Sequence, residues 1–226
     1  MRSWPEKRRK MAKIPKIPYE ISNQLHASLC EFGCARWKAF LRYAEALAKG
    51  CISLPENERS ERAEGIGEKA VTELLNKGII KKADYAEEKI VLPVGKEAPS
   101  FMSLNAFEAF TAVTMELAEK NRRPDLCYPG KTDNYPFHYV FAAEKTLYRV
   151  IVYGQDAISR IGFFNSVYNE TRDKHFETLL VVPEAYTWEE FEDVYIRGRT
   201  RIAFVQEVNP KRKTYKCTLT DIIIEK

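Results

Sequence analysis

The segment from Ile66 to Val94, IGEKAVTELLNKGIIKKADYAEEKIVLPV, predicts the local fold of the N-terminal part of the chain. Apolar residues recur from Ile66 to Leu75 at a spacing of about four, as in a helix with one buried face. Gly78 follows, and glycine tolerates the left-handed conformation that ends helices. Two short apolar runs around a polar turn (83–88) then predict a hairpin. This order indicates a winged helix, although any α+β domain with a helix before a hairpin shares it.

Two further helices are predicted before this segment. Ser22 is expected to cap a helix over residues 23–32, and a second helix is expected over residues 35–49. The polar segment 53–64 is expected to form a loop or a short helix. Three helices and a hairpin give the order of a winged helix-turn-helix domain over residues 19–94.

The remaining chain predicts a long helix and a second domain. Residues 95–123 are expected to hold a linker and a helix capped by Ser103 and running to Lys120. That helix would pack either on the first helix or against a second copy of itself, so a homodimer through residues 103–120 is one alternative. The charged NRRPD stretch and a glycine predict a domain boundary at residues 121–134.

Residues 124–226 read as an α/β sandwich of order ββαβαββ. Buried-type apolar runs predict its strands, and capping residues predict its helices. The expected elements are strands at 135–142 and 147–153, a helix at 157–168, a strand at 176–182, a helix at 188–196, and strands at 201–208 and 214–224.

The composition of the chain limits the classes of protein to which it can belong. The chain has 226 residues, of which 45% are hydrophobic and 12% aromatic, enough for packed cores. No apolar run approaches the roughly 20 residues that a membrane helix needs, and the basic N-terminus lacks the apolar region of a secretory signal. We therefore expect an intracellular, cytoplasmic protein without membrane contact. The cysteines, five in number, form no regular disulfide framework.

The net charge of +4 is unevenly distributed along the chain. Residues 1–16 hold seven of the 36 basic side chains and only one of the 32 acidic ones, so the other 210 residues hold 29 basic and 31 acidic side chains. Residues 1–18 also contain three prolines and are expected to form a flexible arm. A basic arm on a near-neutral body is suited to phosphate contact, and it is equally compatible with a solvated tail.

Chemical motifs are sparse. His26, Cys30 and Cys34 are spaced by four and would share a helical face with Cys51 as a distant fourth ligand, but Gly33 interrupts that face. Packing of this face into the core is therefore the preferred interpretation. The sequence contains no catalytic-triad, P-loop, GxGxxG or HExxH pattern, so no catalytic residue, metal site or cofactor is predicted. His138 is interpreted as a packing residue in a strand.

The C-terminal order of elements resembles that of the PD-(D/E)xK nuclease-like sandwich, whose site needs carboxylates that hold Mg²⁺ beside a lysine. Pro124 and Asp125 provide a possible opening pair, but the strands that follow lack carboxylates. Glu144 and Lys145 have the wrong spacing and are expected in a turn. A residual metal-dependent nuclease is therefore the least favoured function.

Four features of the sequence carry a resemblance to a known family: the AVTELLNKGIIKK helix-to-strand junction, Pro124-Asp125 before a hairpin, the LLVVP strand and the RIAFVQEV strand. With these features the chain resembles the replication-relaxation type of protein from plasmids and conjugative elements. The resemblance covers most of the chain after Tyr19. It implies a winged helix joined to a degenerate nuclease-like domain, and DNA binding in replication, mobilisation or gene control of a mobile element. The sequence lacks the family's usual acid on the second strand of the hairpin, so a shared ion or nucleotide site is not implied.

We expect a non-enzymatic protein that binds double-stranded DNA. The predicted helix would place four side chains in the groove, the hairpin would contact phosphate through three lysines, and the arm would add affinity. The alternative is a protein-interaction module on a winged-helix scaffold, favoured by Glu68 and Glu73 on the same helix. The expected contacts are Lys69, Thr72, Asn76 and Lys77 on the helix, Lys81, Lys82 and Lys89 on the hairpin, and Arg8, Arg9 and Lys10 on the arm.

Overall fold

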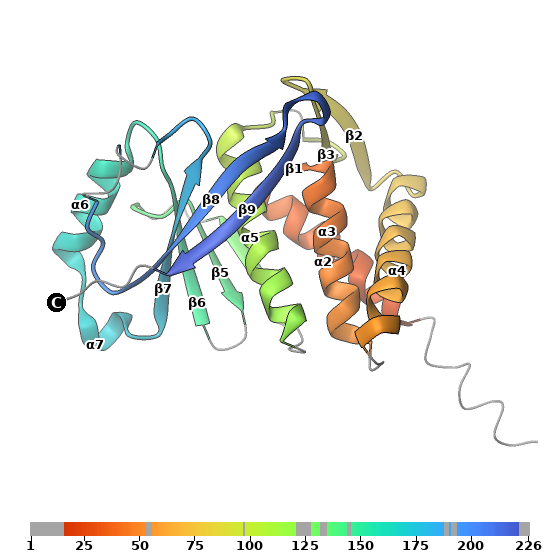
Figure 1. Ribbon diagram of the computed structural model, residues 1–226, viewed down its shortest axis with the longest axis horizontal. Coiled ribbons are helices and arrows are strands. Elements are labelled where there is room, and N and C mark those ends of the chain that lie inside the picture. The colour runs from red at the N-terminus through yellow and green to blue at the C-terminus, as the bar shows by residue number, and fades with distance from the viewer. Residues whose placement is uncertain are drawn as a thin grey trace, which may run out of the picture.

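The computed structural model describes residues 16–52, 56–96, 98–120, 128–131, 135–143, 146–187, 190 and 194–221 (Figure 1). These residues form a mixed α+β fold with a three-stranded and a six-stranded sheet, as the fold class predicted. Within these ranges, no helix combines the length and the apolar character that crossing a bilayer requires.

The N-terminal part follows the predicted order with one addition, a short strand between the first two helices. This strand, β1, pairs antiparallel with β3, which in turn pairs with β2. The elements are α2 (Lys16–Phe32), β1 (Ala35–Arg36), α3 (Trp37–Cys51), α4 (Glu56–Asn76), β2 (Ile80–Tyr85) and β3 (Glu88–Pro93).

The junction at Gly78 confirms the predicted helix end. Gly78 has a φ of +64°, and its N–H donates to the carbonyl of Leu75 at 3.0 Å. The N–H of Ile79 donates to the carbonyl of Leu74 at 3.0 Å, which completes the paired pattern of a Schellman motif. The chain therefore leaves α4 and enters β2 within a few residues.

The predicted start of α4 was wrong, because tertiary packing extends this helix back through the segment expected to be a loop or a short helix. Gly65 and Gly67 lie inside the helix rather than before it. A Cβ atom at Gly67 would lie 2.9 Å from the backbone carbon of Ala44, so the close approach of α3 and α4 at this point needs glycine. Packing against α3 thus offsets the low helix propensity of two glycines.

The first helix also begins earlier than predicted. Pro18 lies in the first turn of α2, where a missing N–H leaves no helical hydrogen bond unmade. Ser22 lies within the helix and is not its cap; its buried hydroxyl donates to the carbonyl of Ala70 at 3.4 Å. The expectation that proline excludes residues 16–18 from a helix was therefore wrong.

Helix α5 (Phe101–Glu119) is the centre of the molecule and lies between the N-terminal helices and the six-stranded sheet (Figure 1). Its cap is Ser100, whose side chain accepts from the N–H of Ser103, so the cap predicted at Ser103 was placed too late. Thirteen of its 19 residues are buried within the chain. These side chains pack within the chain, and the homodimer through residues 103–120 stays a prediction.

The six-stranded sheet has the sequential order β4-β5-β6-β7-β8-β9. Strands β6, β7 and β8 are parallel to one another, and the other neighbours are antiparallel. The predicted hairpin and the buried strand at 176–182 are confirmed, whereas β4 and α7 were not predicted. The bounds are β4 (Tyr128–Lys131), β5 (Tyr139–Ala143), β6 (Thr146–Val152), α6 (Ala157–Val167), α7 (Glu170–Asp173), β7 (Phe176–Pro183), β8 (Arg199–Asn209) and β9 (Thr214–Asp221).

The two faces of this sheet are covered by different helices. On β7, Leu179 and Val181 pack in the cluster that includes α5, and Leu180 and Val182 pack in the cluster that includes α6. The helix expected over 188–196 is not formed at residues 194–196, and most of its other residues lie outside the described ranges.

The larger hydrophobic cluster crosses the domain boundary that the sequence suggested. The ring of Phe32 in α2 lies 4.7 Å from that of Tyr139 in β5, and Phe110 in α5 lies 5.1 Å from Phe141. Residues on both sides of 121–134 thus belong to one core. The segments before and after this boundary pack as one body, with α5 as the shared element.

Candidate functional site

The side chains predicted to contact DNA lie on the surface of α4 and of the β2–β3 hairpin. Helical spacing places Lys69, Thr72 and Asn76 along one exposed stripe of α4. The tight end at Gly78 brings this end of the helix directly beside the first strand of the hairpin. The structure thus joins the two predicted contact regions, whose other members, Lys77, Lys81, Lys82 and Lys89, are also exposed.

Several of the predicted cations already have intramolecular partners. Lys77 pairs with Glu73 at 2.5 Å, and Lys89 pairs with Asp84 at 2.6 Å. The ammonium group of Lys82 lies 3.7 Å from the centre of the Trp37 ring. Exposed pairs of this kind are screened by solvent and contribute little to stability.

The charge of α4 changes along its length. The helix carries six acidic and three basic residues, and most of the acidic ones precede Lys69. The C-terminal end of α4, together with the hairpin, is therefore the more cationic part of this surface. The three arm residues predicted to add affinity, Arg8, Arg9 and Lys10, lie outside the described residues.

The histidine and cysteine pattern does not gather into one site. The Cys30 sulfur lies 3.3 Å from His26 Nε2, but Cys34 is buried and donates to the carbonyl of Ser100 at 3.8 Å. Across the described residues, no group of three or more His, Cys, Asp or Glu side chains is placed to hold a metal ion. The residues of the nuclease comparison, Pro124-Asp125 and Glu144-Lys145, lie outside the described ranges.

His138 lies just before β5 and accepts a hydrogen bond at Nδ1 from the N–H of Val152 at 3.1 Å. Burial, together with the charge of Arg160, lowers the pKa of His138 to about 4. The imidazole is therefore neutral at pH 7 and holds β5 against the end of β6. This geometry agrees with its interpretation as a packing residue.

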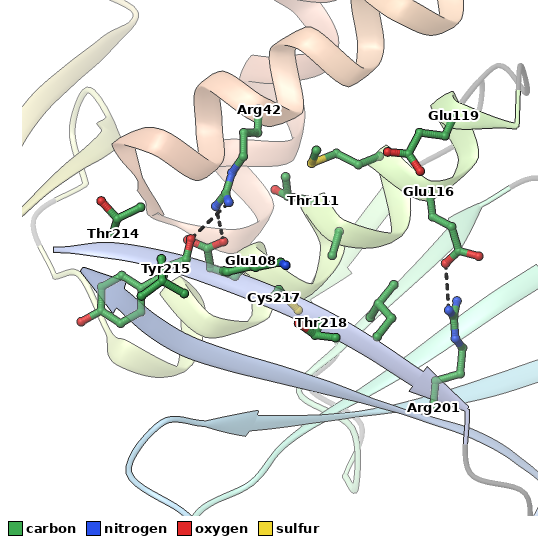
Figure 2. A pocket seen from close by; sticks show the side chains of 15 residues that line it. Arg42, Glu108, Thr111, Glu116, Glu119, Arg201, Thr214, Tyr215, Cys217 and Thr218 are labelled. Atoms are coloured by element: carbon green, nitrogen blue, oxygen red, sulfur yellow. Dashed lines mark hydrogen bonds and ion pairs between the residues drawn. The ribbon is translucent and has the colours of Figure 1, made fainter. Parts of the chain in front are cut away.

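A groove that the sequence did not predict lies between α3, α5 and strands β8 and β9 (Figure 2). Its volume is about 680 Å³, within the range of small-molecule sites. Ala112, Met115 and Leu219 contribute apolar walls, and Glu108 and Thr111 lie on the side of α5 that lines the groove. We refer to this cavity as the α5 groove.

Glu108 and Arg42 form an ion pair at one end of the α5 groove. Arg42 Nη2 donates to Glu108 Oε2 at 2.6 Å, and Arg42 Nη1 donates to the carbonyl of Tyr215 at 3.1 Å. Glu108 is only 2% exposed, and none of the described residues donates a hydrogen bond to its second oxygen, Oε1. The hydroxyl of Thr111, on the next turn of α5, is also buried without a hydrogen-bond partner among the described residues.

Burial raises the pKa of the Glu108 carboxyl, and the charges of Arg42 and Arg36 offset this only in part. At the other end of the groove, Arg201 is held by Glu116 at 2.8 Å and by Asp221 at 2.9 Å. Each end of the groove is thus closed by an arginine–carboxylate pair, and the apolar walls lie between them.

One sequence signal could have located this groove. Glu108 is the only charged residue in the otherwise apolar or neutral stretch 101–115. A lone carboxylate in a buried helix needs a partner, but the sequence does not say which residue provides it. Arg42 is separated from Glu108 by 66 positions, so only the folded chain reveals the pair.

Comparison with known proteins does not assign this surface or this groove. No protein-family model matches the chain, and no curated protein matches it.

Proposed function

We propose that the chain binds double-stranded DNA through a winged helix formed by α2, β1, α3, α4, β2 and β3. The order helix, strand, helix, helix and hairpin supports this proposal, because β1 pairs with the hairpin as the first strand of a winged helix does. In such domains the third helix enters the major groove and the hairpin lies on the adjacent backbone.

The observation that carries the proposal is the continuity of the end of α4 with the hairpin. Lys69, Thr72 and Asn76 form an exposed stripe that leads through Gly78 to Lys81 and Lys82. Side chains with amide and hydroxyl groups are suited to base edges, and lysines are suited to phosphates.

The second part of the chain supports a nuclease-like ancestry within the same proposal. The path α5-β4-β5-β6-α6-β7, with β5 antiparallel to both neighbours and β6 parallel to β7, is consistent with the predicted sandwich. We propose that this part serves as a non-catalytic scaffold and that the protein acts in replication, mobilisation or gene control of a mobile element.

The experiment is a titration of labelled random-sequence duplex DNA at two salt concentrations with the full chain. Combining Lys81→Ala with Lys82→Ala should weaken binding equally for all sequences and reduce the salt slope by about one per lost phosphate contact. The matched control combines Lys174→Ala with Arg197→Ala, which removes the same charge from exposed positions outside the hairpin and should leave the affinity unchanged. Equal losses in both double variants would reject the hairpin as the contact.

A second set of variants tests two further contributions to DNA affinity, a base contact by Asn76 and phosphate contacts by the N-terminal arm. Asn76→Ala should cost about 1–3 kcal/mol on a selected site if Asn76 contacts a base edge, with a smaller effect on random DNA. A variant with alanine at Arg8, Arg9 and Lys10 tests the arm. Loss of all binding in that variant alone would assign DNA affinity to the arm rather than to α4.

A protein-interaction module is the second candidate, because α4 carries twice as many acidic as basic residues. Absence of DNA binding by the full chain at low salt would favour this candidate. An acidic helix surface would then be expected to contact a basic protein partner.

A further inference from the structure

A second cavity lies at the carboxyl ends of the parallel strands β6 and β7, next to the N-terminal end of α5. Its volume is about 520 Å³, a common size for a small-molecule site. The carboxyl ends of strands are also the usual place for ligands in open α/β sheets. We refer to this cavity as the strand-end cleft, and most of its lining comes from the segments 101–105, 152–156 and 183–186.

Asn105 has an unused hydrogen-bond donor on the wall of this cleft. The residue is only 5% exposed, and its Oδ1 accepts from Arg36 Nη1 at 3.0 Å. A guanidinium group only donates, so this bond fixes the orientation of the amide and leaves Nδ2 at its other end. Nδ2 has no hydrogen-bond partner among the described residues, yet it is not one of the buried polar atoms that are closed off from solvent. The small exposed part of Asn105 thus includes an N–H group that is available to a ligand.

His138 provides a second donor on the same lining. Its Nδ1 accepts from the N–H of Val152, so the proton of the neutral ring is on Nε2. The lowered pKa of His138 keeps the ring neutral near pH 7. Like the Asn105 amide, Nε2 has no partner in the part of the chain that the structure describes and is not closed off from solvent. The cleft therefore offers two N–H groups to a molecule that accepts hydrogen bonds.

The charges around the strand-end cleft favour neither an anion nor a cation. Arg36 forms a buried ion pair with Glu88 at 2.7 Å, so its charge is already compensated. Asp156, which has its own arginine partner, and the exposed Glu184 also line the cleft. An anion would be repelled by these two carboxylates, and a cation would meet Arg36 and two N–H groups to which it cannot donate. A neutral molecule with hydrogen-bond acceptors therefore fits this lining best.

Aromatic rings form the apolar part of the cleft. The rings of Tyr153 and Tyr186 lie 4.9 Å apart and nearly perpendicular to each other, and Tyr215 lies on the lining as well. Phe101, at the start of α5, is 50% exposed. Exposed aromatic surface beside a cavity provides the contact area that a flat ring needs.

We infer that the strand-end cleft binds a neutral aromatic amide or lactam, which is a flat ring that carries a carbonyl oxygen. The carbonyl oxygen accepts from Asn105 Nδ2, and His138 provides the second donor. The ring packs against Phe101 and Tyr186. Burial of the ring provides affinity and the N–H groups provide selectivity, as in other small-molecule sites. This inference goes beyond the proposed DNA binding and does not depend on it, because none of the described residues predicted to contact DNA lines the cleft.

Benzamide, benzoate and benzamidine are suitable probes, because they have nearly the same shape and are neutral, anionic and cationic near neutral pH. Their binding to the full chain is measured by titration with chemical shifts of the labelled protein as the readout. Benzamide should bind with a Kd of about 1 mM or tighter and shift signals of the segments 101–105, 152–156 and 183–186. The two ions should bind at least about tenfold more weakly. Equal affinity for all three probes, tighter binding of an ion, or no binding of benzamide at about 20 mM would overturn the inference.

Asn105→Asp tests the donor that anchors the carbonyl oxygen. Aspartate keeps an oxygen for Arg36 and replaces the N–H donor by an acceptor, so benzamide binding should weaken by about tenfold or more. The matched control is Asn23→Asp on the exposed surface of α2, outside the cleft, which should leave the affinity unchanged. Benzamide affinity that is unchanged in Asn105→Asp, with a folded protein by circular dichroism, would contradict the assignment.

His138→Asn provides a second test that leaves the contact between Asn105 and Arg36 intact. Asparagine can place an oxygen near the position of Nδ1 and accept from the N–H of Val152, but it has no group at the position of Nε2. Benzamide binding should weaken by about three- to tenfold in this variant, while circular dichroism shows a folded protein. Unchanged benzamide affinity in both His138→Asn and Asn105→Asp would place the ligand elsewhere and reject the cleft.

Discussion

Asp173 and Glu108 show that burial alone does not determine the state of a carboxyl group. Burial by itself acts to raise the pKa of both groups, but the hydrogen bonds and charges around them differ. At Asp173, hydrogen bonds from Arg172, Asn169 and Arg149 outweigh burial and hold the pKa well below the ordinary aspartate range. At Glu108, one arginine pair does not outweigh it, and the pKa stays above the ordinary glutamate value.

The two sites also differ in what surrounds them. Asp173 ends a single turn of helix and closes a local network that includes the N–H of Asn169. Glu108 lies in the middle of α5 and faces a groove. The Asp173 carboxylate has donors on both oxygens, whereas Glu108 keeps one buried oxygen without a donor among the described residues.

The largest expected effect is the loss of the Asp173 charge. Asp173→Asn should reduce the free energy of unfolding by about 3–5 kcal/mol, because it leaves the largely buried Arg149 without its counter-charge. Urea unfolding monitored by circular dichroism measures this difference. A loss below about 1 kcal/mol would mean that the network adds little to stability.

Removing the single cation beside Glu108 should have a smaller effect that depends on pH. Arg42→Met should cost about 2–3 kcal/mol near pH 8, less than a fully buried pair because Arg42 is 29% exposed. Near pH 5 the cost should fall, since Glu108 can then take up a proton. Lys89→Met, which removes the exposed pair with Asp84, is the control and should change stability by about 0.5 kcal/mol or less at either pH.

The two carboxylates should respond to pH with opposite signs. The lowered pKa of Asp173 means that its stabilisation is present above the ordinary value of 3.8 and is lost as pH falls. The raised pKa of Glu108 means that its stabilisation is complete below the ordinary value of 4.5 and is lost as pH rises through its pKa in the folded protein. Arg42, Arg36 and Glu88 are the charged groups that set this value.

The free energy of unfolding is measured between about pH 3 and pH 8 for the wild type, Asp173→Asn and Glu108→Gln. The differences between these curves give the direction in which each carboxylate changes stability with pH. The advantage of the wild type over Asp173→Asn should grow as pH rises. Its advantage over Glu108→Gln should shrink. Parallel curves for the two variants would contradict the difference between the sites.

The smallest expected effect is that of Glu108→Gln at neutral pH. The change should alter stability by about 1 kcal/mol or less, because glutamine still accepts from Arg42 and no longer carries a buried charge. Thermal unfolding at pH 7 measures it. A loss as large as that of Asp173→Asn would mean that the Glu108–Arg42 pair is as important to the fold as the Asp173 network.

Local patterns in the sequence predicted much of the fold. The apolar spacing from Ile66 to Leu75 and the glycine at position 78 located the end of α4 and the hairpin after it. Apolar runs located β5, β6, β7 and β8 to within a few residues. These features depend on neighbours in the chain, because helix ends and strand faces follow from backbone conformation and side-chain period.

Long-range packing decided the rest. Gly67 lies inside α4 because its missing side chain lets α3 approach, and Ala35 and Arg36 form β1 because β3 is beside them. The sequence by itself determined the end of α4, the hairpin and the apolar strands, since their signals are local. Only the tertiary structure placed α5 at the centre and brought Arg42 to Glu108. Such pairs join positions far apart in the chain, and no local pattern records which donor a buried carboxylate will meet.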